Sequence, residues 1–176
     1  MTVAAWVDGE PLHAEEIEGR LARLRELDRA HSLPDPHTRE GRQLRRWVAQ
    51  VAVVERLCEH EIDGCEVATI GVSARSDAAA LGSIVAAAWA SNATVAQAAH
   101  LVTEHVVLSD RQRDQAARLG ATDDGGVAWT PEQLLISARL EAFARWLARA
   151  THERVRLEEG YEHPGDSTQP DNLHEH

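Results

Sequence analysis

The residues with the greatest chemical potential stand at the C-terminal end of the sequence. Imidazoles and carboxylates gather there at His163, Asp166, Asp171, His174 and His176. Such side chains suit Zn, Ni or Cu, and His174 and His176 could chelate one ion from an irregular backbone. The simpler interpretation is a polar terminus that is disordered or only packs on the surface. Metal binding by these five residues is therefore one prediction, and a purely structural tail is the other.

A second group of metal-ligand types surrounds the two cysteines but has the wrong spacing. Cys58, His60, Glu61 and Cys65 match no thiol–metal pattern, and two thiols cannot supply a four-cysteine zinc site. On a helix, Cys58 would face the apolar side, where a free cysteine behaves as a small hydrophobe. Cys65 lies beyond a glycine that ends this helix. We expect two structural, unpaired thiols.

Catalytic patterns are weak throughout the chain. His100 and His105 are five residues apart with Glu104 between them, whereas an inverted zincin motif needs histidines four apart on one helical face. Ser109 with Asp110 is typical of a helix cap, and no base stands near it in sequence. We predict no catalytic residue.

The aromatic residues are mostly tryptophans, five of seven, at Trp6, Trp47, Trp89, Trp129 and Trp146. An apolar groove lined by tryptophan can hold an extended peptide or a partner helix. Trp47 and Trp146 lie on helical apolar stripes, where packing is the simpler role. Trp89 and Trp129 are expected to be partly exposed. All of these except Trp6 are candidate peptide-binding residues.

Composition narrows the class of protein. The 176 residues carry 18 basic and 29 acidic side chains, a net charge of −11, which disfavours a nucleic-acid partner. The length is typical of one domain. The N-terminus lacks the basic region of a signal peptide, and no apolar run approaches the length of a membrane span. We therefore expect a cytoplasmic protein with no membrane association.

Hydrophobic periodicity predicts mainly helices. A β-prone run at Val3–Val7 ends at the turn Asp8-Gly9, and a final short strand is expected at Val155–Leu157. The two runs could pair and bring the termini together. Helices are predicted at 13–30, 38–62, 81–89, 95–107, 109–119 and 130–151. The last begins with a capping box, Thr130 with Gln133, and the stretch 65–80 has no clear signal.

Three segments resemble SurA-type proteins, which are relatives of the parvulin peptidyl-prolyl isomerases. The opening V-D-G-E-P-L with its acidic helix is similar to the start of SurA N-terminal domains, and VTEHVVLSDRQRDQAARLG resembles the family's linking segment. The stretch EAFARWLARATHERVRLEEGYEHPGDSTQPDNLHEH looks like the C-terminal helix, strand and His-rich tail of uncharacterised actinobacterial relatives. The resemblance implies a SurA-N/trigger-factor-like helical domain with a short pair of β-strands near the termini.

The isomerase domain of the family has no place in this chain, because only residues 120–129 separate the linking segment from the last helix. The resemblance thus carries over a peptide-binding frame and no catalytic residue. We expect one helical domain at 1–160 followed by an irregular His-rich tail at 161–176. A groove between the helices of Trp47 and Trp146 would hold an apolar segment of a client, and the frame could close by forming a homodimer.

The leading functional prediction is a non-catalytic chaperone-like or accessory protein that binds a client or partner protein. The alternative is a metal-binding accessory protein that uses the His-rich tail to deliver or sense Zn, Ni or Cu. A small enzyme whose site leaves no sequence signature is the third possibility.

Overall fold

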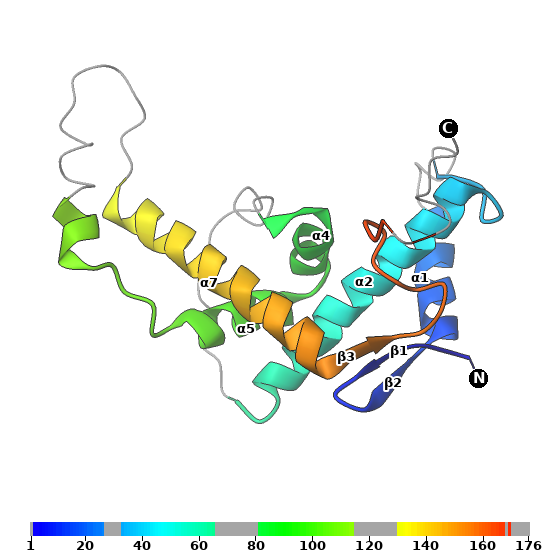
Figure 1. The fold of residues 1–176 in the computed structure, drawn as a ribbon, viewed down its shortest axis with the longest axis horizontal. Coiled ribbons are helices and arrows are strands. Elements are labelled where there is room, and N and C mark those ends of the chain that lie inside the picture. The colour runs from blue at the N-terminus through cyan, green and yellow to red at the C-terminus, as the bar shows by residue number, and fades with distance from the viewer. Residues whose placement is uncertain (1, 27–32, 66–80, 115–129, 168, 170–176) are drawn as a thin grey trace, which may run out of the picture.

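A computed structural model describes residues 2–26, 33–65, 81–114, 130–167 and 169 of the chain. Helices make up most of these residues, and a small three-stranded antiparallel sheet stands beside them (Figure 1). The elements are β1 (Val3–Val7), β2 (Glu10–His13), α1 (Ala14–Arg25), α2 (Arg39–Ile62), α4 (Ser83–Ser91), α5 (Ala93–Thr103), α7 (Pro131–Arg154) and β3 (Val155–Leu157). The prediction of a mainly α fold is confirmed. The stretch 65–80, which had no clear signal, lies almost wholly outside the described residues, and so does the end of the helix predicted at 109–119.

The N-terminal segment forms a hairpin whose second strand the sequence analysis missed. Asp8 and Gly9 both have positive φ, 52° and 82°, as a two-residue turn between antiparallel strands requires. Strand β2 begins directly after the turn, and α1 begins at Ala14, immediately after β2 ends. Pro11 has no N–H to donate, and it is tolerated because β2 lies at the edge of the sheet.

The two β-prone runs do pair, as predicted. Val7 faces Val155 and Ala5 faces Leu157 in antiparallel register, which places β1 between β2 and β3. The amide of Asp8 donates to the Arg154 carbonyl at 2.9 Å and prolongs this ladder. The sheet thereby joins the beginning of the chain to the end of α7.

Helix α2 is the centre of the molecule. It packs against α1, α4, α5, α7 and β1, and every residue from 48 to 55 is buried. The predicted apolar stripe covered only one side of this helix. The structure surrounds the middle of the helix, so three polar residues of α2, Arg46, Gln50 and Glu55, are buried as well. The buried Gln50 side chain has a hydrogen-bond partner, because its amide donates to the Tyr161 carbonyl at 3.1 Å.

The backbone before α2 packs closely against the first turn of the helix. Thr38 caps the helix by accepting from the Gly41 amide, and the Asp35 backbone closes over the turn, so that a Cβ on Gly41 would lie 1.9 Å from the Asp35 carbonyl oxygen. We expect Gly41→Ala to lower the free energy of unfolding by about 2 kcal/mol, as overpacking does. In contrast, a Cβ on Gly19 in α1 meets only an arginine side-chain atom at 3.8 Å.

Gly19→Ala is accordingly the matched control, and it should raise stability by about 0.5–1 kcal/mol through helix propensity. Urea denaturation followed by circular dichroism measures both variants. Equal effects of the two substitutions would contradict the close approach of the 35–36 backbone to α2.

Helices α5 and α7 begin at side-chain caps, whereas α4 begins after Gly82 without one, and α4 and α5 each start two residues away from the predicted positions 81 and 95. Asn92 accepts from the Thr94 amide and separates α4 from α5. Thr130 and Gln133 form the predicted capping box at the start of α7. Helix α5 ends at Thr103, before the predicted 107, where Val106 and Val107 disfavour a helix. Figure 1 shows α7 running straight into β3 while its N-terminal half points away from the sheet.

Candidate binding site

Helix α4 has apolar residues on every side, but only one of them is fully buried. Its sequence, SIVAAAWAS, contains no charged residue; Ala88 is buried, while Ile84, Val85, Ala87 and Trp89 are half-buried against the core. It packs against α2 and α5. Two cavities open beside it, one toward α1 and one toward α7. In the described part of the chain, α4 therefore presents a half-buried apolar surface beside two open cavities.

The first cavity, here called the α1–α4 cavity, lies between α1, α2 and α4 and has a volume of about 520 Å³. Six of its lining residues are apolar: Leu24, Trp47, Val48, Val51, Ala87 and Ala90. The other three, Arg20, Arg23 and Ser91, are polar. Such a volume, with a largely apolar lining and few polar groups, is typical of a ligand-binding site.

Its polar end is built on one buried carboxylate. The Glu55 side chain is only 5% exposed, and it accepts hydrogen bonds from the Arg20 guanidinium and from the Ser91 hydroxyl, both at 2.5 Å. Arg20 also contacts Glu16 at 3.3 Å. A buried charge persists only when it is paired and hydrogen-bonded, and Glu55 meets both conditions. This network fixes α1, α2 and the end of α4 around the cavity.

The second cavity, the α4–α7 cavity, lies between α2, α4 and α7 and measures about 580 Å³. Apolar side chains from all three helices line it, among them Val54, Ile84, Val85 and Leu147. His163 of the C-terminal segment also reaches it. It occupies the position between the Trp47 helix and the Trp146 helix where the sequence analysis expected a groove.

The candidate tryptophans do not converge on one groove. Trp47 lines the α1–α4 cavity, with its indole N–H 3.2 Å from the Ser83 hydroxyl. The Trp89 ring meets Phe143 edge to face with 5.9 Å between the ring centres, and the Trp146 ring stacks on Phe143 with 5.6 Å between the centres. Trp129 lies outside the described residues. Among the described lining residues of the α4–α7 cavity there is no tryptophan, so Trp89 and Trp146 act in packing there.

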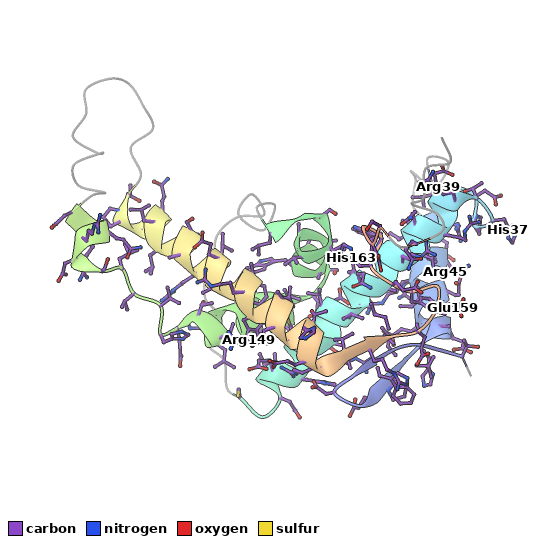
Figure 2. All side chains as sticks on the ribbon, in the orientation of Figure 1. His37, Arg39, Arg45, Arg149, Glu159 and His163 are labelled. Atoms are coloured by element: carbon purple, nitrogen blue, oxygen red, sulfur yellow. The ribbon has the colours of Figure 1, made fainter. Side chains whose placement is uncertain are left out.

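Only two of the five tail residues fall in the described part of the chain. His163 is exposed beside α2 (Figure 2), and its Nδ1 accepts from the Gly165 amide at 3.0 Å. Asp166 is half-buried, and its amide donates to the His163 carbonyl. Asp171, His174 and His176 lie outside. Within the described ranges no three histidine, cysteine or acidic residues group as metal ligands would, and metal binding by the tail stays a prediction.

The described part of the tail is irregular but packed. Tyr161 contacts the core, and Gln169 is 6% exposed. Desolvation raises the pKa of the Tyr161 hydroxyl. The Gln50 side chain holds the Tyr161 carbonyl against α2. Residues 161–167 therefore cover part of the helical body.

The cysteines and the histidines of α5 agree with their structural interpretations. Cys58 is fully buried, and burial raises the pKa of its thiol to about 12, while Cys65 is exposed beyond the end of α2. Both thiols are free. His105 lies after the last residue of α5, so it shares no helical face with His100. Ser109 caps the next helical turn by accepting from the Gln112 amide at 3.3 Å.

An ionic cluster at the tip of the hairpin escaped the sequence analysis. The Arg154 guanidinium donates twice to the Asp8 carboxylate at 2.7 Å and once to Glu61 at 2.8 Å. His60 Nδ1 lies 2.9 Å from Asp8, and its Nε2 lies 3.4 Å from Glu10. These five residues come from three distant segments, so no local spacing could reveal them. The cluster joins the hairpin to the C-terminal ends of α2 and α7.

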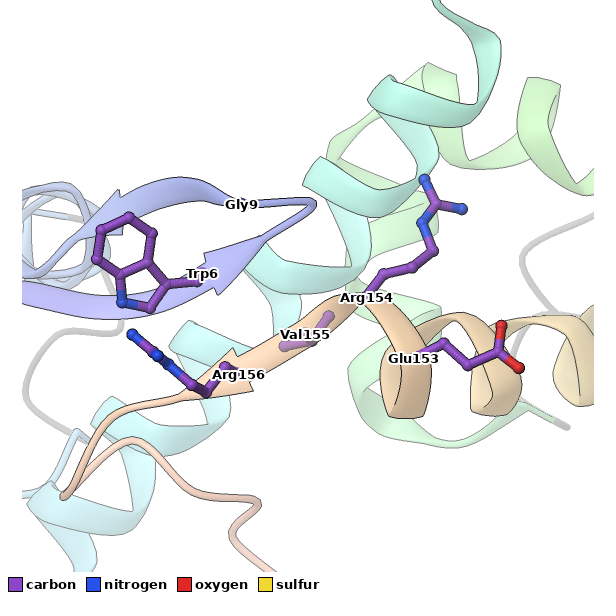
Figure 3. A pocket seen from close by; sticks show the side chains of 6 residues that line it. All are labelled: Trp6, Gly9, Glu153, Arg154, Val155 and Arg156. Carbon is purple, nitrogen blue, oxygen red and sulfur yellow. The ribbon is translucent and has the colours of Figure 1, made fainter.

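A shallow cavity of about 310 Å³ next to this cluster is less suited to a ligand. Figure 3 shows Trp6 of β1 and Arg156 of β3 on one side of it, with Arg154 pointing away toward α2. The Arg156 guanidinium sits 5.4 Å from the Trp6 ring centre, and the Trp6 indole donates to Glu158 at 2.9 Å. The aromatic face and the indole N–H are thus already used within the protein.

The Asp8 carboxylate makes stability depend on pH. The hydrogen bonds from Arg154 lower its pKa from 3.8 to about 2. A depressed folded pKa stabilises the protein above the unfolded pKa, and this contribution is lost progressively as pH falls below about 4 and through the folded pKa. We expect Asp8→Asn to cost about 1 kcal/mol at pH 7, and the difference from wild type to be clearly smaller at pH 2.5.

Asparagine tolerates the positive φ of position 8, so the substitution tests the charge and not the turn. Urea denaturation at pH 7, 4 and 2.5 measures the difference. A gap between wild type and variant that stays constant over this range would show that the carboxylate is not held by Arg154.

The fold and the cavities define a mainly helical protein with a terminal three-stranded sheet and an apolar helix between two open cavities. A family model described as "Family of unknown function (DUF7158)" matches residues 3–40, which span the hairpin, α1 and the start of α2. No curated protein and no solved structure matches the chain. In the described ranges, no helix has both the length and the apolar character needed to cross a membrane.

Proposed function

We propose that this protein is a non-catalytic, chaperone-like or accessory protein that binds an apolar segment of a partner protein beside α4. Its relation to the SurA N-terminal domains belongs to the same proposal. The V-D-G-E-P-L segment that suggested the relation forms the β-hairpin leading into α1.

The observation that carries the proposal is the state of α4. A helix with apolar residues all round normally lies inside a protein, yet here only Ala88 is fully buried and the other apolar side chains of α4 remain half-buried beside open cavities. The adjoining cavities have volumes of about 520 and 580 Å³ and mainly apolar linings. Burying such a surface against an apolar segment would contribute roughly 25 cal/mol per Å² before the costs of association.

The test is direct binding of a fluorescent, uncharged apolar peptide, followed by anisotropy. Ala87 lines the α1–α4 cavity and is half-buried, so Ala87→Glu would place a charge in the site. We expect this substitution to weaken binding at least tenfold. Ala93→Glu, at an exposed position in the first turn of α5, is the matched control and should leave binding unchanged.

The variants must first show the same thermal unfolding midpoint as the wild type. Failure of the wild type to bind apolar peptides at micromolar concentrations would overturn the proposal. Binding that is equally weak in both variants would show that the effect of Ala87→Glu comes from net charge and not from the cavity.

A further inference from the structure

We infer that the α1–α4 cavity selects apolar peptide segments that carry a carboxylate next to the anchoring side chain, and that Arg23 is the residue that reads this carboxylate. The inference rests on the proposed function and names the chemistry of the partner. It concerns only this cavity, whose lining differs in charge from that of the α4–α7 cavity.

The described lining of the α1–α4 cavity contains two arginines, Arg20 and Arg23, and no acidic residue. The charge of Arg20 is balanced by Glu55 and Glu16, whereas Arg23 has no carboxylate partner among the described residues. The described lining of the α4–α7 cavity, by comparison, contains no arginine, lysine or acidic residue. Only the first cavity therefore combines an apolar surface with a cationic side.

The two arginines have different roles. Arg20 is already committed, because its guanidinium contacts both the buried Glu55 and Glu16. Arg23, one turn further along α1, is exposed and makes no hydrogen bond or ion pair with the described residues. A guanidinium beside an apolar cavity is suited to pair with a carboxylate. Arg23 is thus the uncommitted charge of the site.

Local geometry keeps Arg23 at this cavity. Leu24, its neighbour, lines the same cavity, while Leu21 and Ile17 fix α1 to the core from its buried side. Trp47 lies across from α1 on α2 and offers an apolar ring. A segment with a leucine or isoleucine side chain in the cavity and an aspartate one residue away would satisfy both the apolar lining and Arg23.

The experiment compares two blocked, fluorescent peptides that differ in one residue. One carries Leu-Ile-Asp and the other Leu-Ile-Asn within the same uncharged flanks. At low ionic strength we expect the aspartate peptide to bind the wild-type protein about threefold to tenfold more tightly, as a partly exposed ion pair allows. Raising the salt concentration should reduce this preference.

Arg23→Gln should abolish the preference while leaving the asparagine peptide's affinity unchanged. Arg25→Gln is the matched control, because Arg25 lies on the same helix but does not line the cavity. That variant should keep the preference. The indole N–H signal of Trp47, assigned through Trp47→Phe, should move on titration of the aspartate peptide and so locate the binding.

Each outcome decides between the two proposals. Equal binding of the two peptides to the wild type would overturn the inference and leave the proposed function intact. Absence of binding by either peptide would overturn both. A preference that survives in Arg23→Gln would overturn the assignment to Arg23.

Discussion

Replacing Phe143 by alanine is expected to lower the free energy of unfolding by about 4 kcal/mol, within the usual range for a large buried aromatic residue. Phe143 is 1% exposed and is the largest fully buried side chain among the described residues. It lies between Trp89 of α4 and Trp146 of α7. The loss therefore includes two aromatic contacts, each contributing about 0.5–1.5 kcal/mol beyond burial.

Urea denaturation followed by tryptophan fluorescence measures this loss, and Phe143→Leu should cost much less, about 1–1.5 kcal/mol. Val107, which is 78% exposed, supplies the control. Val107→Ala should change stability by no more than about 0.5 kcal/mol. A Phe143→Ala variant as stable as Val107→Ala would mean that α4 and α7 are not joined through this ring.

The second large effect is expected at Glu55. Glu55→Ala should cost about 3 kcal/mol, because it removes the main partner of Arg20 and the carboxylate acceptor of the Ser91 hydroxyl, which then has only the backbone carbonyls of α4. Glu16 contacts the same arginine from a side chain that is 36% exposed. Glu16→Ala should therefore cost no more than about 1 kcal/mol.

Glu55→Gln separates charge from shape, since it keeps a hydrogen-bond acceptor for Ser91 but loses the negative charge. We expect an intermediate cost. The free energies come from urea denaturation at pH 7. If Glu55→Ala and Glu16→Ala had the same effect, the buried carboxylate would not be what fixes α1 against α2 and α4. Interactions other than the Glu55 hydrogen bonds would then hold the helices around the α1–α4 cavity.

These residues show the limit of reasoning from sequence about the site. Tryptophans on apolar stripes suggested a groove between the Trp47 and Trp146 helices. The structure places Trp146 on Phe143, and Trp47 lines the α1–α4 cavity with its indole N–H on Ser83 of α4. Periodicity predicts that a face is apolar but not which neighbouring helix it meets. The two cavities beside α4 depend on that choice of neighbour.

Local signals in the sequence determined where the elements begin. Thr38 and Thr130 cap α2 and α7, and the β-prone runs at either end pair as predicted, because caps, turns and strand patterns act over a few residues. Strand β2 was missed because Pro11 argues against a strand unless the strand lies at an edge.

Only the tertiary structure decided what surrounds each helix. It buried α2 on all sides, gave Glu55 its partners from α1 and α4, and brought Asp8, His60 and Arg154 together. Contacts between residues far apart in the chain depend on how the helices pack, and no local pattern encodes that packing. The candidate site is made of such contacts.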